Sequence, residues 1–248
     1  MTMRDWAGKR YWMVGASEGL GRAVTEAVNR AGAEVIVSAR SADRLEALVA
    51  ELPGRARAVA MDVSDQASVE AAAQEAGEID GMVYLAGLYW PQSSRDWNAQ
   101  EITAMADVNF MGAIRVLGQI VPQLVARDSG HLVLTGSLSG FRGLAGAQGY
   151  VPSKAGIMVL AESLYADFRR TGIDVQLINP GFIRTRLTDK NDFAMPQRME
   201  PEDAARRFFE HMNGDRFKLS YPAPLSTIFR GSQFLPDWLY YPLFNANR

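Results

Sequence analysis

Short, nearly continuous apolar runs alternate along the chain with segments in which apolar residues recur every three or four positions. In the first hundred residues, runs such as RYWMV (10–14) and AEVIVSA (33–39) alternate with segments such as 21–32. Within that segment Ala23, Val24, Ala27 and Val28 would share one helix face. The pattern predicts the order β-α-β-α-β-α-β, and the continuous apolar strands indicate a sheet covered on both faces.

The alternation continues to about residue 221. Further elements are expected as a long helix near 99–127, a strand at 131–137, a helix at about 150–170, a strand at 173–180, a helix at 204–212 and a strand around 217–222. Repeated β-α-β units build a doubly wound parallel sheet of the α/β class, a Rossmann fold. We find no internal repeat or linker, so a single domain is expected over residues 1–248.

Composition narrows the possible functions. A net charge of -2 argues against a nucleic-acid partner, and the lack of cysteine excludes disulfides, a thiolate nucleophile and a thiolate metal site. The two histidines, His131 and His211, have no partner at metal-ligand spacing, so no metal site is predicted. The first residues are polar, and no apolar run approaches the ~18 residues that span a bilayer. A cytoplasmic protein is therefore expected.

A glycine-rich turn, GASEGLG, follows the first predicted strand and precedes a helix. Gly15 would allow a sharp turn, Gly19 would let the backbone approach a pyrophosphate, and Gly21 would let the helix pack closely on the sheet. Ser17, Glu18 and Leu20 complete the turn, whose helix would offer amide donors to phosphates. The alternative is a tight turn without a ligand.

The end of the second strand bears on which dinucleotide would bind. An acidic residue there would bind a free ribose hydroxyl, whereas a basic residue would accommodate a 2′-phosphate. Arg40 and Ser41 stand at this position with no acid, which favours NADP(H) over NAD(H). Glu18 adds a negative charge that would not help, and Arg40 could instead be a solvated loop residue.

Ser137, Tyr150 and Lys154 form the candidate catalytic group. Ser137 ends a predicted strand, and residues 150 and 154 share one face at the start of a helix. An ammonium next to a phenol favours the phenolate, so Lys154 is expected to lower the pKa of Tyr150. Ser137 would hydrogen-bond a substrate oxygen while Tyr150 exchanges a proton with it.

The turn GASEGLG, the Ser137 and Tyr150-x-x-x-Lys154 pattern, and Pro180-Gly181 after a strand resemble the short-chain dehydrogenase/reductase family up to about residue 221. The serine lies thirteen residues before the tyrosine, as in that family. The resemblance implies that Asn109 joins the catalytic group by helping to hold a water-linked proton path to the lysine. It also implies cofactor contacts from Tyr150, Lys154, Asp62, Val63, Ala86, Gly87, Pro180, Gly181, Ile183 and Thr185. Asp62 could alternatively cap the next helix.

The leading hypothesis is an oxidoreductase that moves a hydride between NADP(H) and an apolar or aromatic carbonyl or secondary alcohol. We expect the apolar lining from residues in loops after strand ends, namely Leu88, Tyr89, Trp90, Trp97, Leu144 and Phe182. The alternatives are a catalytically silent NAD(P)-binding regulatory or scaffolding protein and a membrane-associated lipid-modifying reductase. The resemblance implies a homodimer or homotetramer formed through the two long helices.

Residues 182–248 are expected to form a substrate lid and an aromatic C-terminal tail. From residue 219 the chain is crowded with aromatic residues, leucine and proline and shows no clean period. Three roles stay open for this tail: core or dimer packing, a wall of the substrate pocket, or membrane contact. The membrane contact would use Trp238, Leu239, Tyr240, Tyr241 and Phe244.

Overall fold

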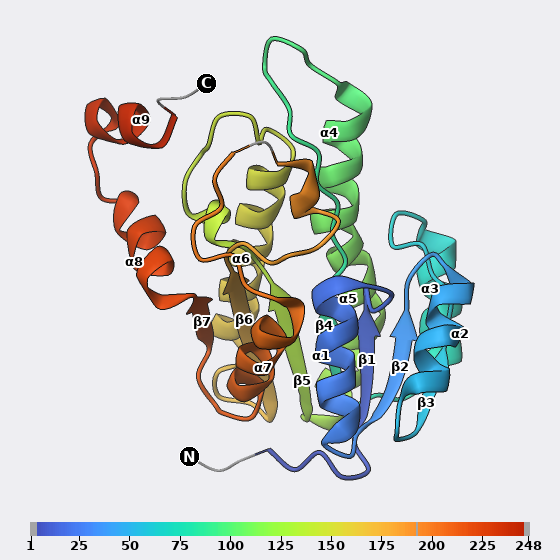
Figure 1. Cartoon of the computed structure of the whole chain (residues 1–248). Coiled ribbons are helices and arrows are strands. Elements are labelled where there is room, and N and C mark those ends of the chain that lie inside the picture. The colour runs from blue at the N-terminus through green and yellow to red at the C-terminus, as the bar shows by residue number, and fades with distance from the viewer. Residues whose placement is uncertain (1–3, 192, 246–248) are drawn as a thin grey trace.

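The predicted apolar runs form one parallel sheet in the structure, a computed structural model that describes residues 4–191 and 193–245 (Figure 1). Its seven strands have the order β3-β2-β1-β4-β5-β6-β7. The strands are β1 (Arg10–Val14), β2 (Glu34–Ser38), β3 (Ala56–Ala58), β4 (Gly81–Tyr84), β5 (Gly130–Thr135), β6 (Ile173–Pro180) and β7 (Lys218–Tyr221). This confirms the expected doubly wound fold.

Helices cover both faces of the sheet. The helices are α1 (Gly19–Arg30), α2 (Ala42–Glu51), α3 (Gln66–Ala76), α4 (Ala99–Ala106), α5 (Gly112–Arg127), α6 (Tyr150–Phe168), α7 (Pro201–Met212), α8 (Ala223–Ser232) and α9 (Asp237–Asn245). Buried apolar residues of α1, α2 and α7 form one cluster, and those of α3, α5 and α6 form another. The sheet lies between the two clusters, so the molecule has three layers.

Strand β1 shows why the strands had to be apolar throughout. Its side chains point alternately to the two faces, so Trp12 and Val14 join the cluster under α3, α5 and α6. Tyr11 and Met13 join the cluster under α1, α2 and α7. Since both faces are dry, neither can carry the polar residues that a half-exposed strand would show.

The long helix expected near 99–127 is present, but it is not uniform. A π-helical segment, Asp107–Met111, separates α4 from α5 and widens the helix by one residue per turn at that point. The stretch Ala99–Arg127 is long and apolar enough to cross a membrane by length and composition alone. Its buried residues, among them Val116, Ile120 and Leu124, belong to the core between the sheet and the helices.

The tail that showed no period forms two short helices, α8 and α9, which follow the edge strand β7. We call residues 223–245 the C-terminal arm. In Figure 1 the arm runs along one side of the molecule, beyond β7 and toward the loops above the sheet. It is less regular in sequence because Pro222 and Pro242 flank or interrupt its helices, and because its apolar residues face both inward and outward.

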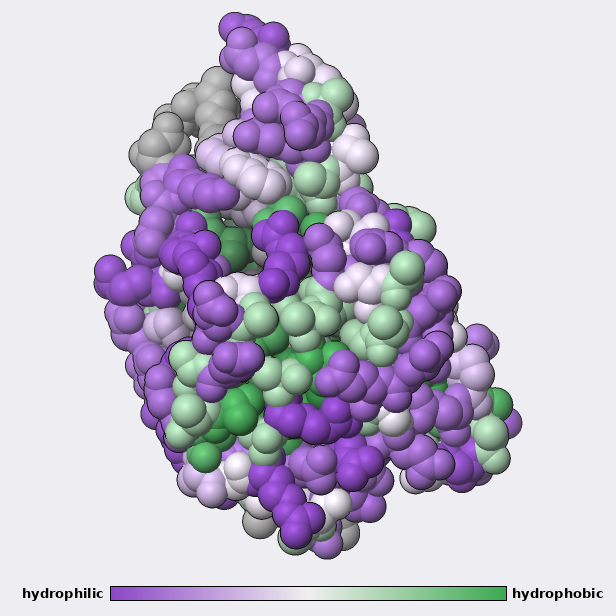
Figure 2. All heavy atoms as spheres, turned by 90° about the vertical axis from the view of Figure 1, so that its right-hand side faces the viewer, coloured by the Kyte–Doolittle hydropathy of each residue, from purple (hydrophilic) through white to green (hydrophobic). Residues whose placement is uncertain are grey.

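The strand order reverses between β1 and β4, which are hydrogen-bonded neighbours although three helices separate them in sequence. In such sheets ligands bind in the crevice outside the carboxyl ends of the strands at this reversal. The opposite, β3 side of the molecule is mostly polar on its surface, with apolar patches at mid-height (Figure 2). The loops above β1, β4, β5 and β6 are therefore where a site is expected.

Candidate functional site

The glycine-rich turn follows β1 and leaves no room for a side chain at two points, one of which also has a positive φ. Gly15 has a φ of 91°, and a Cβ placed on it would lie 2.4 Å from the amide nitrogen of Ala86. A Cβ on Gly21 would lie 2.0 Å from the carbonyl oxygen of Gly15. These two glycines let β4 and α1 approach the turn closely, which opens a groove above the strand ends.

Every residue that the sequence nominated for cofactor contact lines this one groove of about 580 Å³. It begins at the glycine turn, passes the ends of β2 and β4, and reaches Tyr150 and Lys154. The nominated residues in it are Gly15, Ser17, Glu18, Gly19, Leu20, Gly21, Arg40, Ser41, Asp62, Val63, Ala86, Gly87, Tyr150, Lys154, Pro180, Gly181, Ile183 and Thr185. Segments up to about 170 residues apart in sequence thus meet along a single channel.

Amide donors and positive charges face this groove. No side chain caps the first turn of α1, so amide groups there keep their hydrogen-bonding capacity. Arg40 lines the groove together with Arg44, which the sequence analysis had not singled out. The carboxylate of Glu18 pairs with Arg44 at 2.9 Å and with Arg186 at 3.2 Å, so its negative charge is balanced locally.

Asp62 lies in the groove and does not cap the next helix. The cap of α3 is Asp65, whose side chain accepts from the amide of Ala67. Burial acts to raise the pKa of Asp62, but hydrogen bonds from Ser64 and the charge of Arg40 outweigh it and leave that pKa below its usual value. Asp62 is therefore a carboxylate at neutral pH, with acceptor capacity beside the groove.

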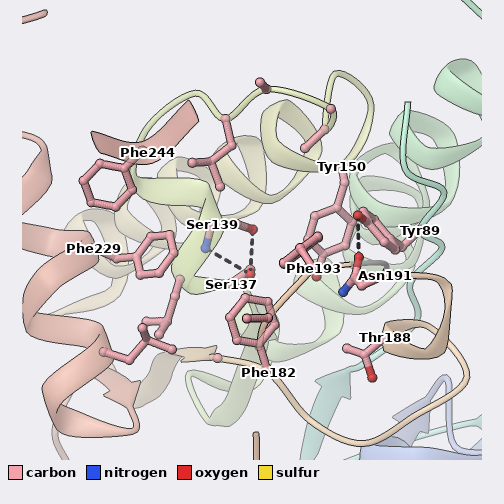
Figure 3. A pocket seen from close by; sticks show the side chains of 18 of the residues that line it. Tyr89, Ser137, Ser139, Tyr150, Phe182, Thr188, Asn191, Phe193, Phe229 and Phe244 are labelled. Carbon is pink, nitrogen blue, oxygen red and sulfur yellow. Dashed lines mark hydrogen bonds between the residues drawn. The ribbon is translucent and has the colours of Figure 1, made fainter. Parts of the chain in front are cut away.

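A second cavity, of about 400 Å³, adjoins the groove and is mainly apolar (Figure 3). We call it the apolar pocket. Of the nominated lining residues, Tyr89, Leu144 and Phe182 line it and Leu88 lines the groove. The prediction was wrong for Trp90 and Trp97: Trp97 is 59% exposed, and the ring of Trp90 packs against the ammonium of Lys190, 4.4 Å away.

Ser137 and Tyr150 line both cavities. The hydroxyl of Ser137 is 2.8 Å from that of Ser139 and accepts from its amide, because a 3-10 turn, Leu138–Phe141, starts right after Ser137. Figure 3 shows Ser137 midway between Tyr150 and the aromatic residues at the other end of the pocket. Hydroxyl groups thus mark the junction of the polar groove and the apolar pocket.

The pKa of Tyr150 is raised, contrary to the sequence-based expectation. Burial raises it to about 12, and hydrogen bonding with Ser137 acts in the opposite direction without overcoming the loss of hydration. The ring of Tyr89 packs edge-on against that of Tyr150 at a centroid distance of 5.1 Å and excludes water from it. The phenol of this site therefore holds its proton at neutral pH.

Lys154 lies on the same face of α6, as its spacing predicted. Its Nζ is 5.9 Å from the centroid of the Tyr150 ring and donates to the carbonyl oxygen of Thr135 at 3.0 Å. Burial lowers the pKa of Lys154 to about 8. At this distance the ammonium does not offset the burial of Tyr150, which explains why the expected lowering of the tyrosine pKa is wrong.

Asn109 sits in the π-helical segment and is fully buried. Its side chain accepts from the amide of Leu88 at 2.6 Å and donates to the carbonyl of Leu88 and to the hydroxyl of Ser153, each at 3.0 Å. A Cβ placed on Gly87 would lie 3.6 Å from the side-chain oxygen of Asn109 and 3.8 Å from Nζ of Lys154. Asn109 therefore fixes the loop after β4 beside the lysine.

Sequence reasoning missed several residues of the site. Arg44, Arg184, Arg186 and Lys190 add positive charge to the groove, and Ser139, Asn191 and the arm residues Leu225, Phe229, Leu243 and Phe244 line the apolar pocket. Arg44 could have been found, because it lies one helical turn beyond Arg40. For the arm, the sequence analysis left a wall of the pocket open as one role of the tail, but only the tertiary fold brings these particular side chains to the pocket.

The geometry resolves part of the question of the tail. Tyr240 is buried, and Leu243 and Phe244 line the apolar pocket, so the arm is both packed against the body and a wall of the pocket. Trp238 and Tyr241 are exposed. Membrane contact through these residues stays a prediction.

His131 and His211 are buried and structural. His131 lies between the hydroxyl of Tyr11 and the amide of Gln176, each at 2.9 Å. Among the described residues, no cluster of histidine and acidic side chains has metal-binding geometry.

Fold and site together define a dinucleotide-binding α/β protein with a serine, tyrosine and lysine at the end of its groove. A sequence profile of the family described as short chain dehydrogenase matches residues 9–195. An uncharacterized oxidoreductase of Myxococcus xanthus is 35% identical over 98% of both chains, and one of Staphylococcus epidermidis is 30% identical over 78% of this chain and 86% of its own. The chain belongs to the short-chain dehydrogenase family.

Solved structures have the same fold. A short-chain dehydrogenase from Streptomyces avermitilis is 27% identical, covers 90% of this chain and 91% of its own, and superposes with a TM-score of 0.82. One from Burkholderia phymatum in complex with NAD and one from Sphingobium yanoikuyae in complex with NADPH, both 24% identical, superpose with TM-scores of 0.83 and 0.81. The Burkholderia protein covers 91% of this chain and 93% of its own, and the Sphingobium protein 90% and 91%.

Proposed function

We propose that this protein is an NADP(H)-dependent oxidoreductase that interconverts an uncharged, apolar ketone or aldehyde and the corresponding alcohol. The observation that carries the proposal is the position of Ser137 and Tyr150, which line the groove and the apolar pocket at once. A substrate in the pocket would present its oxygen to these hydroxyls, next to a cofactor in the groove.

The groove suits a dinucleotide. The uncapped amides of α1 and the glycine turn would hold the pyrophosphate, and Asp62 with Val63 would lie beside the adenine. Arg40, Ser41 and the neighbouring Arg44 favour a 2′-phosphate at the end of β2, which itself carries no acidic residue. Glu18 of the glycine turn pairs with Arg44 and Arg186, so Arg40 is the guanidinium that this carboxylate leaves available. A nicotinamide cofactor, when bound, supplies the hydride that a carbonyl carbon accepts.

The protein's own groups handle the proton. Ser137 would donate a hydrogen bond to the substrate oxygen, and Tyr150, protonated at neutral pH, would transfer its proton to that oxygen during reduction. The charge of Lys154 would stabilise the phenolate left behind, and Asn109 would keep the loop after β4 in register beside the lysine. In oxidation the same groups act in reverse.

The substrate class follows from the pocket. None of the described residues that line it carries a charge, and most are apolar or aromatic. A carboxylate or phosphate on the substrate would lose its hydration there without a partner, which costs several kcal/mol. Residues 182–248 would supply the lid and the aromatic end of this pocket.

The assembly proposed is a homodimer or homotetramer. Large apolar side chains are exposed on α5 and α6 or just before them, namely Met111, Ile114, Val125, Val159 and Tyr165. Two copies could bury these faces against each other. We also propose that the protein is located in the cytoplasm.

The central test replaces Tyr150→Phe and measures ketone-dependent oxidation of NADPH together with NADPH binding by fluorescence. We expect kcat to fall at least about 10³-fold, because only the phenolic oxygen moves the proton, while the Kd for NADPH changes less than about twofold. Tyr165→Phe on the same helix is the matched control and should stay active. An active Tyr150→Phe variant would refute the role, and a wild-type protein that binds NADPH but turns over no carbonyl compound would favour a regulatory protein instead.

A further inference from the structure

Arg142 connects the segment that carries Ser137 to the C-terminal arm. It follows the 3-10 turn directly, and its side chain is only 17% exposed. Its Nη1 donates to the carbonyl oxygens of Ser232 at 2.8 Å and Leu235 at 2.6 Å, and its Nη2 pairs with the carboxylate of Asp237. One guanidinium thus binds the end of α8, the loop after it and the start of α9.

The same guanidinium lies on an aromatic ring of α9. Its carbon is 3.9 Å from the centroid of the Tyr240 ring, a cation–π contact with a side chain that is 1% exposed. The hydroxyl of Tyr240 donates to the carbonyl of Gly143 at 2.8 Å. Residues 142 and 143 therefore hold α9 by the carboxylate of Asp237 and by the ring and hydroxyl of Tyr240, while the backbone contacts of Arg142 hold the end of α8 and the loop before α9.

Tyr240 in turn packs against a side chain that lines the apolar pocket. Its ring stacks on Phe244 with centroids 4.7 Å apart, and Phe244 in turn meets Phe229 of α8 edge-on at 5.9 Å. Both phenylalanines line the pocket, at the end opposite Tyr150 in Figure 3. The wall farthest from the reacting hydroxyls is thus placed by contacts that begin five residues after Ser137.

We propose that Arg142 is a positioning residue that sets the length of the apolar pocket, so that the protein selects uncharged carbonyl compounds whose apolar chain reaches from Tyr150 to Phe229 and Phe244. The inference rests on the proposed function and adds the residue that defines the substrate's length. Asp237 is 81% exposed, so its ion pair with Arg142 contributes little. The carbonyl contacts and the stacked ring are the contacts that hold the arm.

The test uses a series of methyl ketones from butanone to 2-dodecanone with NADPH as reductant, measuring kcat and KM for each. In the wild type, kcat/KM should rise about threefold to fourfold per methylene until the chain fills the pocket, as expected for burying one methylene group. Arg142→Ala should flatten this rise, with KM for the longest ketones about tenfold higher or more. Its kcat and KM for butanone should stay within about twofold of the wild type.

Three further variants separate positioning from general destabilisation. Arg142→Lys keeps a charge over Tyr240 but cannot reach two carbonyls and a carboxylate together, so it should restore part of the chain-length dependence. Phe244→Ala should reproduce the effect of Arg142→Ala on long ketones, because it removes the pocket wall itself and leaves the hydrogen bonds of Arg142 to Ser232 and Leu235 in place. Arg206→Ala, which breaks an exposed ion pair with Asp203 on α7, is the matched control and should leave the whole series unchanged.

The outcomes distinguish the two levels of the proposal. Turnover with the same chain-length dependence in the wild type and in Arg142→Ala would overturn the inference and leave the proposed function standing. An equal loss of kcat on butanone and on long ketones in Arg142→Ala would also overturn it, since a positioning role acts through KM of the long substrates. No turnover of any carbonyl compound or alcohol by the wild type would overturn the proposed function, and the inference with it.

Discussion

Lys154 is buried and Tyr150 is half-buried, and the loss of hydration favours the neutral form of both groups: it raises the pKa of Tyr150 and lowers the pKa of Lys154. The tyrosine keeps its proton at neutral pH, while the lysine is left close to the point at which it loses its own. In the proposed mechanism the protonation of Tyr150 is therefore insensitive to pH near neutrality, whereas the charge of Lys154 is not.

This difference predicts the pH dependence of ketone reduction. Because the pKa of Lys154 is lowered to about 8, its ammonium is present below that pH and is lost above it. We expect kcat/KM to be constant from about pH 6 to 7.5 and to fall about tenfold per pH unit well above 8. A stopped-flow profile that stays flat to pH 10 would contradict the role of the lysine charge.

A second prediction at this scale concerns the choice of cofactor. Arg40→Ala should weaken NADPH binding at least about tenfold, or about 1.4 kcal/mol, because a phosphate partner is lost, and should change NADH binding less than about twofold. Fluorescence titrations at one salt concentration would measure both. Arg30→Ala, at the far end of α1, is the control. Equal losses for the two cofactors would rule out a contact of Arg40 with the 2′-phosphate.

Among the elements, the helical stretch from α4 to α5 is tied most directly to the site. Its π-helical segment carries Asn109, whose three hydrogen bonds join the loop after β4 to α6. Without the extra residue in this turn, the side chain at 109 would point in a different direction. The π-helical turn that interrupts this otherwise regular helix therefore serves to orient the side chain of Asn109.

We expect Asn109→Ala to lower the free energy of unfolding by about 2 kcal/mol, because the backbone groups of Leu88 lose buried partners. It should also reduce kcat at least about tenfold by freeing the loop next to Lys154. Asn98→Ala on the same stretch removes only the cap of α4 and should cost about 1 kcal/mol with kcat unchanged. Urea unfolding and steady-state kinetics on both variants would compare the two effects, and an unaltered kcat in Asn109→Ala would refute the link.

Periodicity was sufficient to predict the elements that pack on the sheet, because burial on one or both faces leaves a repeat in the sequence. The π-helical segment left no such mark, since Asp107–Met111 continues the helical spacing on either side. The helices of the arm were missed because Tyr240 is buried while Trp238 and Tyr241 are exposed, so no single apolar face repeats. The site was recognised by spacing, but the hydrogen bonds of Arg142 span 90 to 95 residues and could come only from the fold.

At the scale of the whole molecule, several large apolar side chains of α5 and α6 are exposed, among them Ile114, Val125 and Val159. Val159 on α6 is 62% exposed. The β3 side of the molecule is mostly polar, with apolar patches at mid-height (Figure 2). Association through the α5 and α6 faces is the arrangement that would remove these side chains from water.

Val159→Glu should therefore reduce the assembly to a monomer, because two copies would bring buried carboxylates together at the proposed interface. Sedimentation velocity would measure the change in mass, and Glu46→Lys on α2 is the control for a charge change on another face. An unchanged mass for Val159→Glu, or a wild type that is already monomeric, would show that α6 is not an interface.

The arm begins after β7, and β7 is the last strand at one edge of the sheet. Replacing residues 223–248 with the tail of a relative would therefore alter no strand pairing and leave the glycine turn, Tyr150 and Lys154 in place. The grafted tail would have to offer backbone carbonyls and an aromatic ring that Arg142 can bind. If the arm sets the substrate range as proposed, the proposed reaction and the choice of substrate lie in separate segments of the chain, and the second could change while the first stays constant.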